Sequence, residues 1–278
     1  MRQTGSMPAR INPDGPLKGR VALVTGASRG IGEAIAVRLA MEGARVAVSA
    51  RTAEPGESRL PGTLNDTVAR LRAAGGDALL IKADLAQPSE RERLVAETAA
   101  ALGEVDILIN NAAITFFMPV ADFTEKRLNL MMEVQVHAPF HLSQLVLPGM
   151  KARRRGWIVN ISSGAGIHPK PPYPPNARGG TVYGMCKAAL ERFSTGLAAE
   201  VQGDGIAVNA VSPGLVATPG VAVHGLITEA TKDRVQPIEY IAEAVYRLAS
   251  ADPSVLTGRV AYAEPLLKEL DVTPSALV

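Results

Sequence analysis

Short runs of apolar, largely β-branched residues recur along the chain, separated by longer stretches with helical periodicity. Seven of these runs are expected to form strands, over residues 21–26, 45–50, 78–83, 105–110, 157–162, 206–211 and 258–263. The stretches between them include residues 30–43, 89–103, 182–202 and 237–250, whose patterns are typical of amphipathic helices. Continuous apolar strands that alternate with helices indicate a parallel sheet covered on both faces.

This order predicts an α/β fold, a single Rossmann-type doubly wound parallel sheet of about seven strands with helices on both faces. No shift in composition resembles a linker, so residues 18–278 are expected to form one domain. Residues 1–17 are expected to be a flexible N-terminal extension. Residues 164–182 form a segment of unusual composition, with five prolines between positions 168 and 180.

Composition narrows the function to small-molecule chemistry. Hydrophobic residues make up 47% of the chain and the formal net charge is +2, which favours neither disorder nor nucleic-acid binding. The single cysteine, Cys186, excludes an intramolecular disulfide framework, fits a cytoplasmic location and, with histidines that lack ligand spacing, predicts no metal site. The chain contains neither a signal-peptide core nor an apolar run of about 18 residues, so no membrane association is expected.

Three glycines, Gly26, Gly30 and Gly32, lie between the first expected strand and the first expected helix. Glycine allows the positive φ that a tight turn needs and the close approach of a pyrophosphate, which the free N–H groups of a helix N-terminus attract. The spacing is G-x-x-x-G-x-G, at the position where a dinucleotide site is expected. A glycine-rich turn without a ligand is the alternative.

The end of the second expected strand indicates which dinucleotide would bind. Many dinucleotide sites carry an acidic residue here that binds the ribose hydroxyl. This chain has Ala50 and Arg51 instead, and Arg29 lies inside the glycine turn. Guanidinium groups suit a phosphate, so NADP is predicted over NAD. In the alternative interpretation, both arginines are solvated loop residues.

Tyr183 and Lys187 are four residues apart in an expected helix and therefore share one face. A phenol titrates near pH 10, and a neighbouring ammonium is expected to lower that pKa. Tyr183 could then exchange a proton with an alcohol or a ketone. Ser163, at the end of an expected strand, precedes this pair.

The chain resembles the short-chain dehydrogenase/reductase family over about residues 18–262. The resemblance is carried by TGASRGIG (25–32), ADL (83–85), NNAA (110–113), NISS (160–163), YGMCK (183–187) and VSPGLVAT (211–218). Residues 50–76 and 125–134 also resemble the hydroxysteroid dehydrogenase-like subgroup, which does not by itself identify a steroid substrate.

This resemblance implies roles for individual residues. Tyr183 would be the general acid/base, Lys187 would bind the nicotinamide ribose and tune Tyr183, and Ser163 would orient the carbonyl. Asp84 would accept from the adenine amino group, with Leu85 beside the ring and Asn110 near the adenine ribose. The implied cofactor-binding set is Gly26, Ser28, Arg29, Gly30, Ile31, Gly32, Arg51, Asp84, Leu85, Asn111, Ala112, Tyr183, Lys187, Pro213, Gly214, Val216 and Thr218.

Several of these residues also have a purely structural interpretation. Asp84 could cap a helix, Asn110 and Asn111 could stabilise the edge of the sheet, and Pro213 and Gly214 could form a plain turn.

Gln135 stands where the family has a catalytic asparagine. Pro139, four residues later, has no N–H for the carbonyl of Gln135, so that carbonyl would stay free in a helix. Gln135 is therefore predicted to support the proton relay through its main chain, and a purely structural Gln135 is the alternative.

The proline-rich segment is a second departure from the family pattern. It lengthens the connection from Ser163 to Tyr183, whereas the stretch after residue 218 looks short for a substrate lid. Residues 164–182 are therefore interpreted as a substrate-loop insertion. We expect it to supply part of the substrate wall, with Tyr173 facing the ligand. The alternative is a surface loop that faces solvent or a neighbouring subunit. The C-terminal segment departs from the family ending and is expected to take part in subunit contacts.

These observations favour an NADP(H)-dependent oxidoreductase that interconverts a carbonyl and a secondary alcohol. A dinucleotide-binding sensor without catalytic activity is the alternative from another class. A methyltransferase with a similar glycine turn is disfavoured because it leaves Tyr183 and Lys187 unexplained. The resemblance further implies a homo-oligomer, a tetramer formed through helices around residues 124–152 and 181–202.

Overall fold

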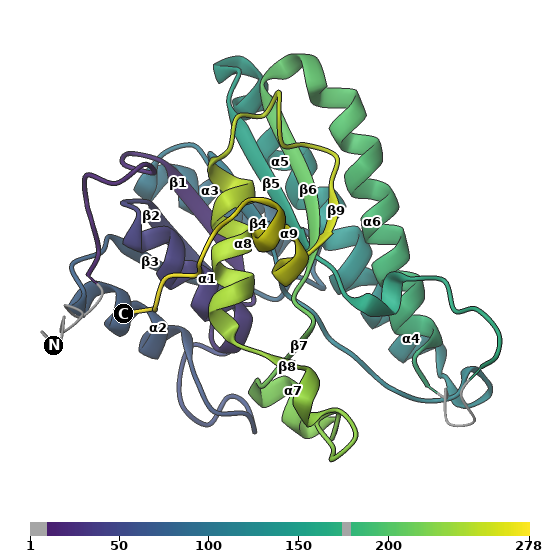
Figure 1. Ribbon diagram of the computed structural model, residues 1–278. Helices are drawn as coiled ribbons and strands as arrows, with labels where there is room; N and C mark the ends of the chain where they lie inside the picture. The colour runs from purple at the N-terminus through teal and green to yellow at the C-terminus, as the bar shows by residue number, and fades with distance from the viewer. Residues whose placement is uncertain (1–9, 174–178) are drawn as a thin grey trace, which may run out of the picture.

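The structure, a computed structural model, describes residues 10–173 and 179–278 and is built around a seven-stranded parallel sheet (Figure 1). The strand order is β3-β2-β1-β4-β5-β6-β9. The strands are β1 (Val21–Thr25), β2 (Arg45–Ala50), β3 (Ala78–Lys82), β4 (Ile107–Asn110), β5 (Gly156–Ile161), β6 (Ile206–Ser212) and β9 (Val260–Tyr262). The seven expected strands and the doubly wound sheet are confirmed.

Helices cover both faces of the sheet because successive strand residues point to opposite sides. In β1, Ala22 and Val24 join the core under one helix layer, whereas Leu23 joins the core under the other. The first layer contains α1 (Gly30–Met41), α2 (Leu64–Ala73), α8 (Ile238–Ser250) and α9 (Ala263–Glu269). The second contains α3 (Pro88–Leu102), α5 (Ala138–Arg153) and α6 (Thr181–Val201).

The carboxyl ends of β1, β4, β5 and β6 lie along one edge of the sheet because all four strands are parallel. The connections that leave this edge carry the motifs singled out in the sequence, at residues 26–32, 110–113, 162–163 and 213–218. A two-stranded sheet, β7 (Leu215–Val216) with β8 (Val235–Gln236), and the short helix α7 (Pro219–Val223) continue from the end of β6.

A π-helical turn, η2 (Glu133–His137), interrupts the helical segment that runs from α4 (Glu125–Met132) into α5. The Ala138 N–H donates to the Glu133 carbonyl, five residues earlier. Pro139 follows directly and has no N–H to offer to the carbonyl of Gln135. Such turns are frequently found at functional sites.

Residues 10–17, which were expected to belong to a flexible extension, contact the rest of the domain. The Leu17 side chain is fully buried in the core, and its N–H donates to the Glu42 carbonyl at 2.8 Å. The Asn12 N–H donates to the Met41 carbonyl at 2.9 Å. These contacts tie the segment to the end of α1, which the sequence pattern of the segment does not reveal. The rest of the extension lies outside the described residues.

Candidate active site

The glycine turn has the backbone geometry that its sequence predicts. Gly26 and Gly30 adopt φ values of +66° and +56°. A Cβ on Gly32 would lie 2.3 Å from the Gly26 carbonyl oxygen, so only glycine fits there. Helix α1 begins at Gly30 without a side-chain hydrogen bond from its N-cap residue, Arg29. Its first N–H groups and the positive end of its dipole thus remain available to an anion.

The segment after β4 holds this turn in place. The Asn111 Nδ2 group donates to the Thr25 carbonyl at 2.8 Å and to the Gly26 carbonyl at 3.1 Å. The main-chain N–H groups of Asn111 and Ala112 both donate to Thr25 Oγ1, at 3.0 and 3.2 Å. Asn111 therefore stabilises the glycine turn directly, which is close to its structural interpretation.

The segment that follows β6 reaches the same turn from across the sheet. A Cβ on Gly30 would lie 3.3 Å from the Thr218 side chain, and Thr218 caps α7 by accepting from the Val221 N–H. Gly214 adopts φ +73°, and Val216 is buried in the small sheet. The structure thus brings Thr218, the last residue of the predicted segment 213–218, to the glycine turn.

The two arginines of the predicted phosphate site differ in their surroundings. Arg51 is exposed at the end of β2. Arg29 donates to the Gly62 carbonyl at 2.7 Å and to Ser58 Oγ at 3.1 Å, and its burial lowers its pKa. Arg29 is therefore held by the loop that follows β2, whereas the Arg51 guanidinium faces solvent.

Asp84 and Asn110, both expected near the adenosine part of the cofactor, have different surroundings in the structure. Asp84 accepts from the Ala86 N–H at 3.1 Å, and because α3 starts four residues later behind the N-cap residue Gln87, Asp84 is not its cap. Asn110 is buried and donates to Asn160 Oδ1 at 2.8 Å. The Asn160 amide donates in turn to Ser194 Oγ at 2.8 Å. The Asn110 side chain thus belongs to a buried amide chain inside the sheet, as its structural interpretation has it.

Ser163, Tyr183 and Lys187 come together where β5 ends beside the start of α6. Lys187 is only 4% exposed and donates to the Ile161 carbonyl at 2.9 Å. Its Nζ lies 5.6 Å from the centroid of the Tyr183 ring. Ser163 accepts from the Ala165 N–H at 3.2 Å, which fixes its side chain at the head of the turn. The Lys187 ammonium group thus points into the protein, toward the end of β5.

The expectation that Lys187 lowers the pKa of Tyr183 is not met in the chain alone. Burial raises the pKa of the Tyr183 phenol and outweighs a hydrogen bond with Ser163, which acts in the opposite direction. Burial also lowers the pKa of Lys187 to about 8, so the ammonium is itself poorly solvated. Desolvation decides the direction of both shifts, because Lys187 is buried and Tyr183 is half-buried.

Replacement of Lys187 by methionine is expected to stabilise the cofactor-free protein near neutral pH. Below pH 8 the wild type must keep a buried ammonium, at a cost of about 3 kcal/mol for the shift from 10.5 to about 8. Between pH 8 and 10.5 the folded state loses this proton before the unfolded state does, so wild-type stability rises with pH.

Urea unfolding of both proteins at pH 7 and pH 10 tests this prediction. The advantage of the variant should shrink as the pH rises, and an advantage that stays constant would contradict it. Lys268→Met is the matched control, because that side chain is 75% exposed and its removal should not produce this pH dependence.

Gln135 is buried inside the π-helical turn. Its Nε2 group donates to the Ile114 carbonyl at 2.8 Å, and its Oε1 finds no hydrogen-bond partner among the described residues. The side chain therefore anchors the segment after β4, while Pro139 leaves the Gln135 carbonyl without its usual helical partner. Both the predicted main-chain role and the structural role are compatible with this arrangement.

An aromatic residue that the sequence analysis missed contacts Tyr183. The Phe117 ring meets the Tyr183 ring edge-on with centroids 5.6 Å apart, and it meets the His224 ring in the same way at 4.9 Å. The Met118 N–H donates to the Gly179 carbonyl at 3.2 Å, which ties this segment to the insertion. No motif surrounds Phe117, so only its place after β4 could have drawn attention to it.

The predicted substrate wall is described only in part. Tyr173 is 63% exposed, and no contact places it beside Tyr183. Residues 174–178 of the insertion lie outside the described residues. Within the described ranges no group of three His, Cys, Asp or Glu side chains could hold a metal ion, and no helix is long and apolar enough to cross a bilayer.

Comparisons with known proteins agree on one family. The sequence profile of the short chain dehydrogenase family matches residues 20–225. The chain is 34% identical to the 3-oxoacyl-(acyl-carrier-protein) reductase FabG of Escherichia coli K12 over 248 residues, which are 87% of this chain and 94% of that protein. It is 31% identical to human hydroxysteroid dehydrogenase-like protein 2 over 92% of this chain and 59% of that protein.

A solved structure shows the same fold. It is a metagenomic short-chain oxidoreductase in complex with NADP, 30% identical in sequence, with a TM-score of 0.72 over 94% of this chain and 100% of the other.

Proposed function

The chain belongs to the short-chain dehydrogenase family of oxidoreductases, and from that premise we propose that it interconverts a carbonyl and a secondary alcohol with NADP(H). The convergence of Ser163, Tyr183 and the buried Lys187 at one edge of the sheet, beside the glycine turn, carries this proposal. A chain that had kept only the fold would have no need to hold an ammonium group in its interior, where burial opposes its charge.

The cofactor supplies or accepts the hydride when it is bound. The glycine turn, with Asn111 and Ala112 behind it, would hold its pyrophosphate, and Asp84 and Leu85 would bound the adenine. The segment from Pro213 to Thr218 would hold the nicotinamide end. These assignments fit the open N-terminus of α1 and the approach of Thr218 to Gly30.

Proton transfer is assigned to residues of this chain. Ser163 donates a hydrogen bond that orients the substrate oxygen, and the Tyr183 hydroxyl gives a proton to that oxygen during reduction or takes one during oxidation. Lys187 would bind the ribose, and we propose that its charge favours the Tyr183 phenolate only once the cofactor is bound, since burial dominates the Tyr183 pKa in the cofactor-free chain. The Gln135 carbonyl would extend the relay toward solvent, because Pro139 leaves it free.

Arg51 is expected to decide between NADP and NAD. Its exposed guanidinium lies at the end of β2 with no carboxylate next to it in the chain, so it can pair with a phosphate. Arg51→Ala should weaken NADPH binding about tenfold or more, the loss expected for one charged hydrogen bond, and should leave NADH binding unchanged. Fluorescence titration with both cofactors measures this difference, and an unchanged preference for NADPH would refute the assignment.

Turnover separates the proposed enzyme from a dinucleotide-binding sensor. Binding of NADPH is established first, and absorbance of the reduced nicotinamide is then followed with a broad panel of ketones, and in the other direction with NADP and alcohols. Hydride transfer to any carbonyl supports the proposed function. Tight NADPH binding without turnover across the whole panel would favour the sensor, and no binding would exclude both.

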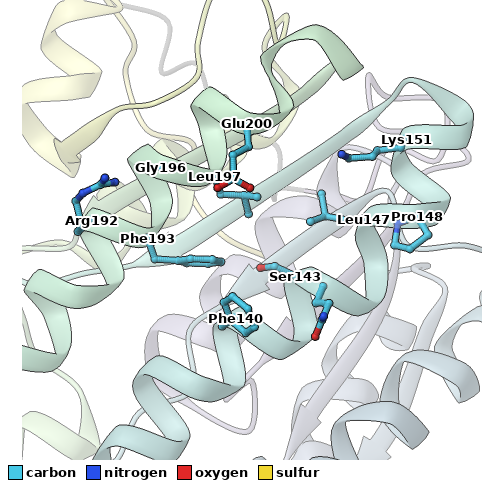
Figure 2. Close-up of a pocket in the computed structure, with 11 residues that line it drawn as sticks. Phe140, Ser143, Leu147, Pro148, Lys151, Arg192, Phe193, Gly196, Leu197 and Glu200 are labelled. Atoms are coloured by element: carbon cyan, nitrogen blue, oxygen red, sulfur yellow. The ribbon is translucent and has the colours of Figure 1, made fainter.

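We further propose that the protein forms a homo-oligomer through α5 and α6, in the cytoplasm, as the resemblance and the single cysteine imply. A cavity of about 720 Å³ lies between these helices. Figure 2 shows Phe140, Leu147, Phe193 and Leu197 among its lining residues. Phe140 is 55% exposed and packs on Phe193 with ring centroids 5.7 Å apart. An exposed apolar surface of this kind is typical of a contact between subunits.

Phe140→Glu is expected to dissociate this oligomer, because it would place a charge in an apolar contact. The molar mass from light scattering should fall to that of a smaller species. Val255→Glu is the control, since Val255 is 79% exposed, lies between α8 and β9, and should leave the mass unchanged. A wild type that is already monomeric would refute the proposal.

A further inference from the structure

The turn that carries Ser163 is held by groups to which the proposed chemistry gives no role. The Ser162 hydroxyl donates to Glu191 Oε1 at 2.5 Å, and a Cβ on Gly166 would lie 2.9 Å from the same oxygen. A Cβ on Gly164 would lie 3.6 Å from the hydroxyl oxygen of Tyr262, at the end of β9. Residues 162–166 are therefore fixed between α6 and β9.

Glu191 also acts on the site from within α6. It follows Lys187 by four residues, so the two side chains share one face of the helix. Burial lowers the pKa of Lys187, and the charges of Cys186 and Glu191 oppose that effect. Within the described ranges the Tyr183 ring and the Ile161 carbonyl of β5 also face Lys187, and neither carries a negative charge when the phenol is protonated.

The Glu191 carboxylate also affects the pKa of Tyr262. Its pKa is raised first by burial and then by the charge of Glu191. The carboxylate thus hydrogen-bonds with Ser162, which follows β5, and its charge acts on Lys187 of α6 and on Tyr262 of β9. Different substitutions can remove the charge of Glu191 and its hydrogen bond with Ser162, so the two effects can be tested separately.

We infer that Glu191 is a positioning residue of this active site: its hydrogen bond with Ser162 holds the turn that presents Ser163, and its negative charge supports the ammonium form of Lys187. The inference rests on the proposed roles of Ser163 and Lys187. Glu191 does not contact the reacting atoms in this scheme and acts only through these two neighbours.

Two substitutions separate the two effects. Glu191→Gln keeps an oxygen that accepts from Ser162 but removes the charge. For carbonyl reduction by this variant, kcat/KM should begin to fall at a pH about one unit lower than in the wild type. Relative to the wild type, kcat/KM should then be about tenfold lower at pH 9 and less than about twofold lower at pH 6. Ser162→Ala keeps the charge but removes the hydrogen bond. It should lower kcat by about tenfold at every pH without moving the profile.

A merely structural Glu191 would give another result. In that case Glu191→Gln would superimpose on the wild type or lower the rate equally at every pH, and either outcome overturns the inference. A Ser162→Ala variant with wild-type kcat would overturn the part that concerns Ser163. Glu92→Gln is the matched control, because that side chain is 62% exposed on α3 and should leave the profile unchanged.

A measurement without turnover distinguishes this inference from the proposed function. In the cofactor-free protein, the rise in unfolding free energy that we assign to Lys187 should begin at lower pH in Glu191→Gln than in the wild type. An identical pH dependence in both proteins refutes the inference alone. A wild type that binds NADPH and transfers no hydride refutes the proposed function alone.

Discussion

Replacement of Tyr183 by phenylalanine is expected to lower kcat by about 10²- to 10⁴-fold, the range for loss of a general acid/base. Phenylalanine keeps the ring and thus the edge-on contact with Phe117 at 5.6 Å between centroids. It removes only the hydroxyl that would exchange a proton with the substrate oxygen. The loss should therefore appear in kcat, with the binding of NADPH and the unfolding free energy close to those of the wild type.

Steady-state kinetics and a cofactor titration of the same preparation check this prediction. A variant that retains more than about a tenth of the activity would show that another group transfers the proton, since the range above starts at a hundredfold loss. Ser163→Ala is the informative companion. It should also reduce kcat, because Ser163 orients the substrate oxygen and hydrogen-bonds with Tyr183.

The second large effect is expected at Gly32, where alanine should abolish dinucleotide binding. Its Cβ would lie 2.3 Å from the Gly26 carbonyl oxygen and 2.5 Å from Asn111 Nδ2. Neither atom can move freely, because the Asn111 side chain donates to the carbonyls of Thr25 and Gly26. Relief of this clash would open the turn at the point where the pyrophosphate would bind, and should cost about 1–3 kcal/mol of stability.

Gly203→Ala is the control for this change. A Cβ there meets nothing within 4 Å, so stability and cofactor affinity should stay close to the wild type. Isothermal titration with NADPH and urea unfolding measure both quantities in both variants. Wild-type affinity in a folded Gly32→Ala protein would show that the glycine turn is not the dinucleotide site, and the proposed function would lose its cofactor site.

The succession of strands and helices along the chain and the doubly wound sheet could be predicted from the amino-acid sequence. Apolar periodicity and glycine spacing depend only on residues that are close together in the chain, so they predict these elements without knowledge of long-range contacts. For the same reason, the tight turn at Gly26 and Gly30 and the shared helix face of Tyr183 and Lys187 followed from spacing alone.

The surroundings of the site residues could not be predicted in this way, because they depend on how distant segments pack. Three contacts of the site join residues from different segments: Asn110 with Asn160, Phe117 with Tyr183, and Ser162 with Glu191. The burial of Lys187 likewise depends on neighbouring segments. The pKa values of Lys187 and Tyr183 follow from desolvation by those distant neighbours, which is why spacing on one helix predicted a different direction for Tyr183. Packing between segments far apart in the chain sets the electrostatics of this site.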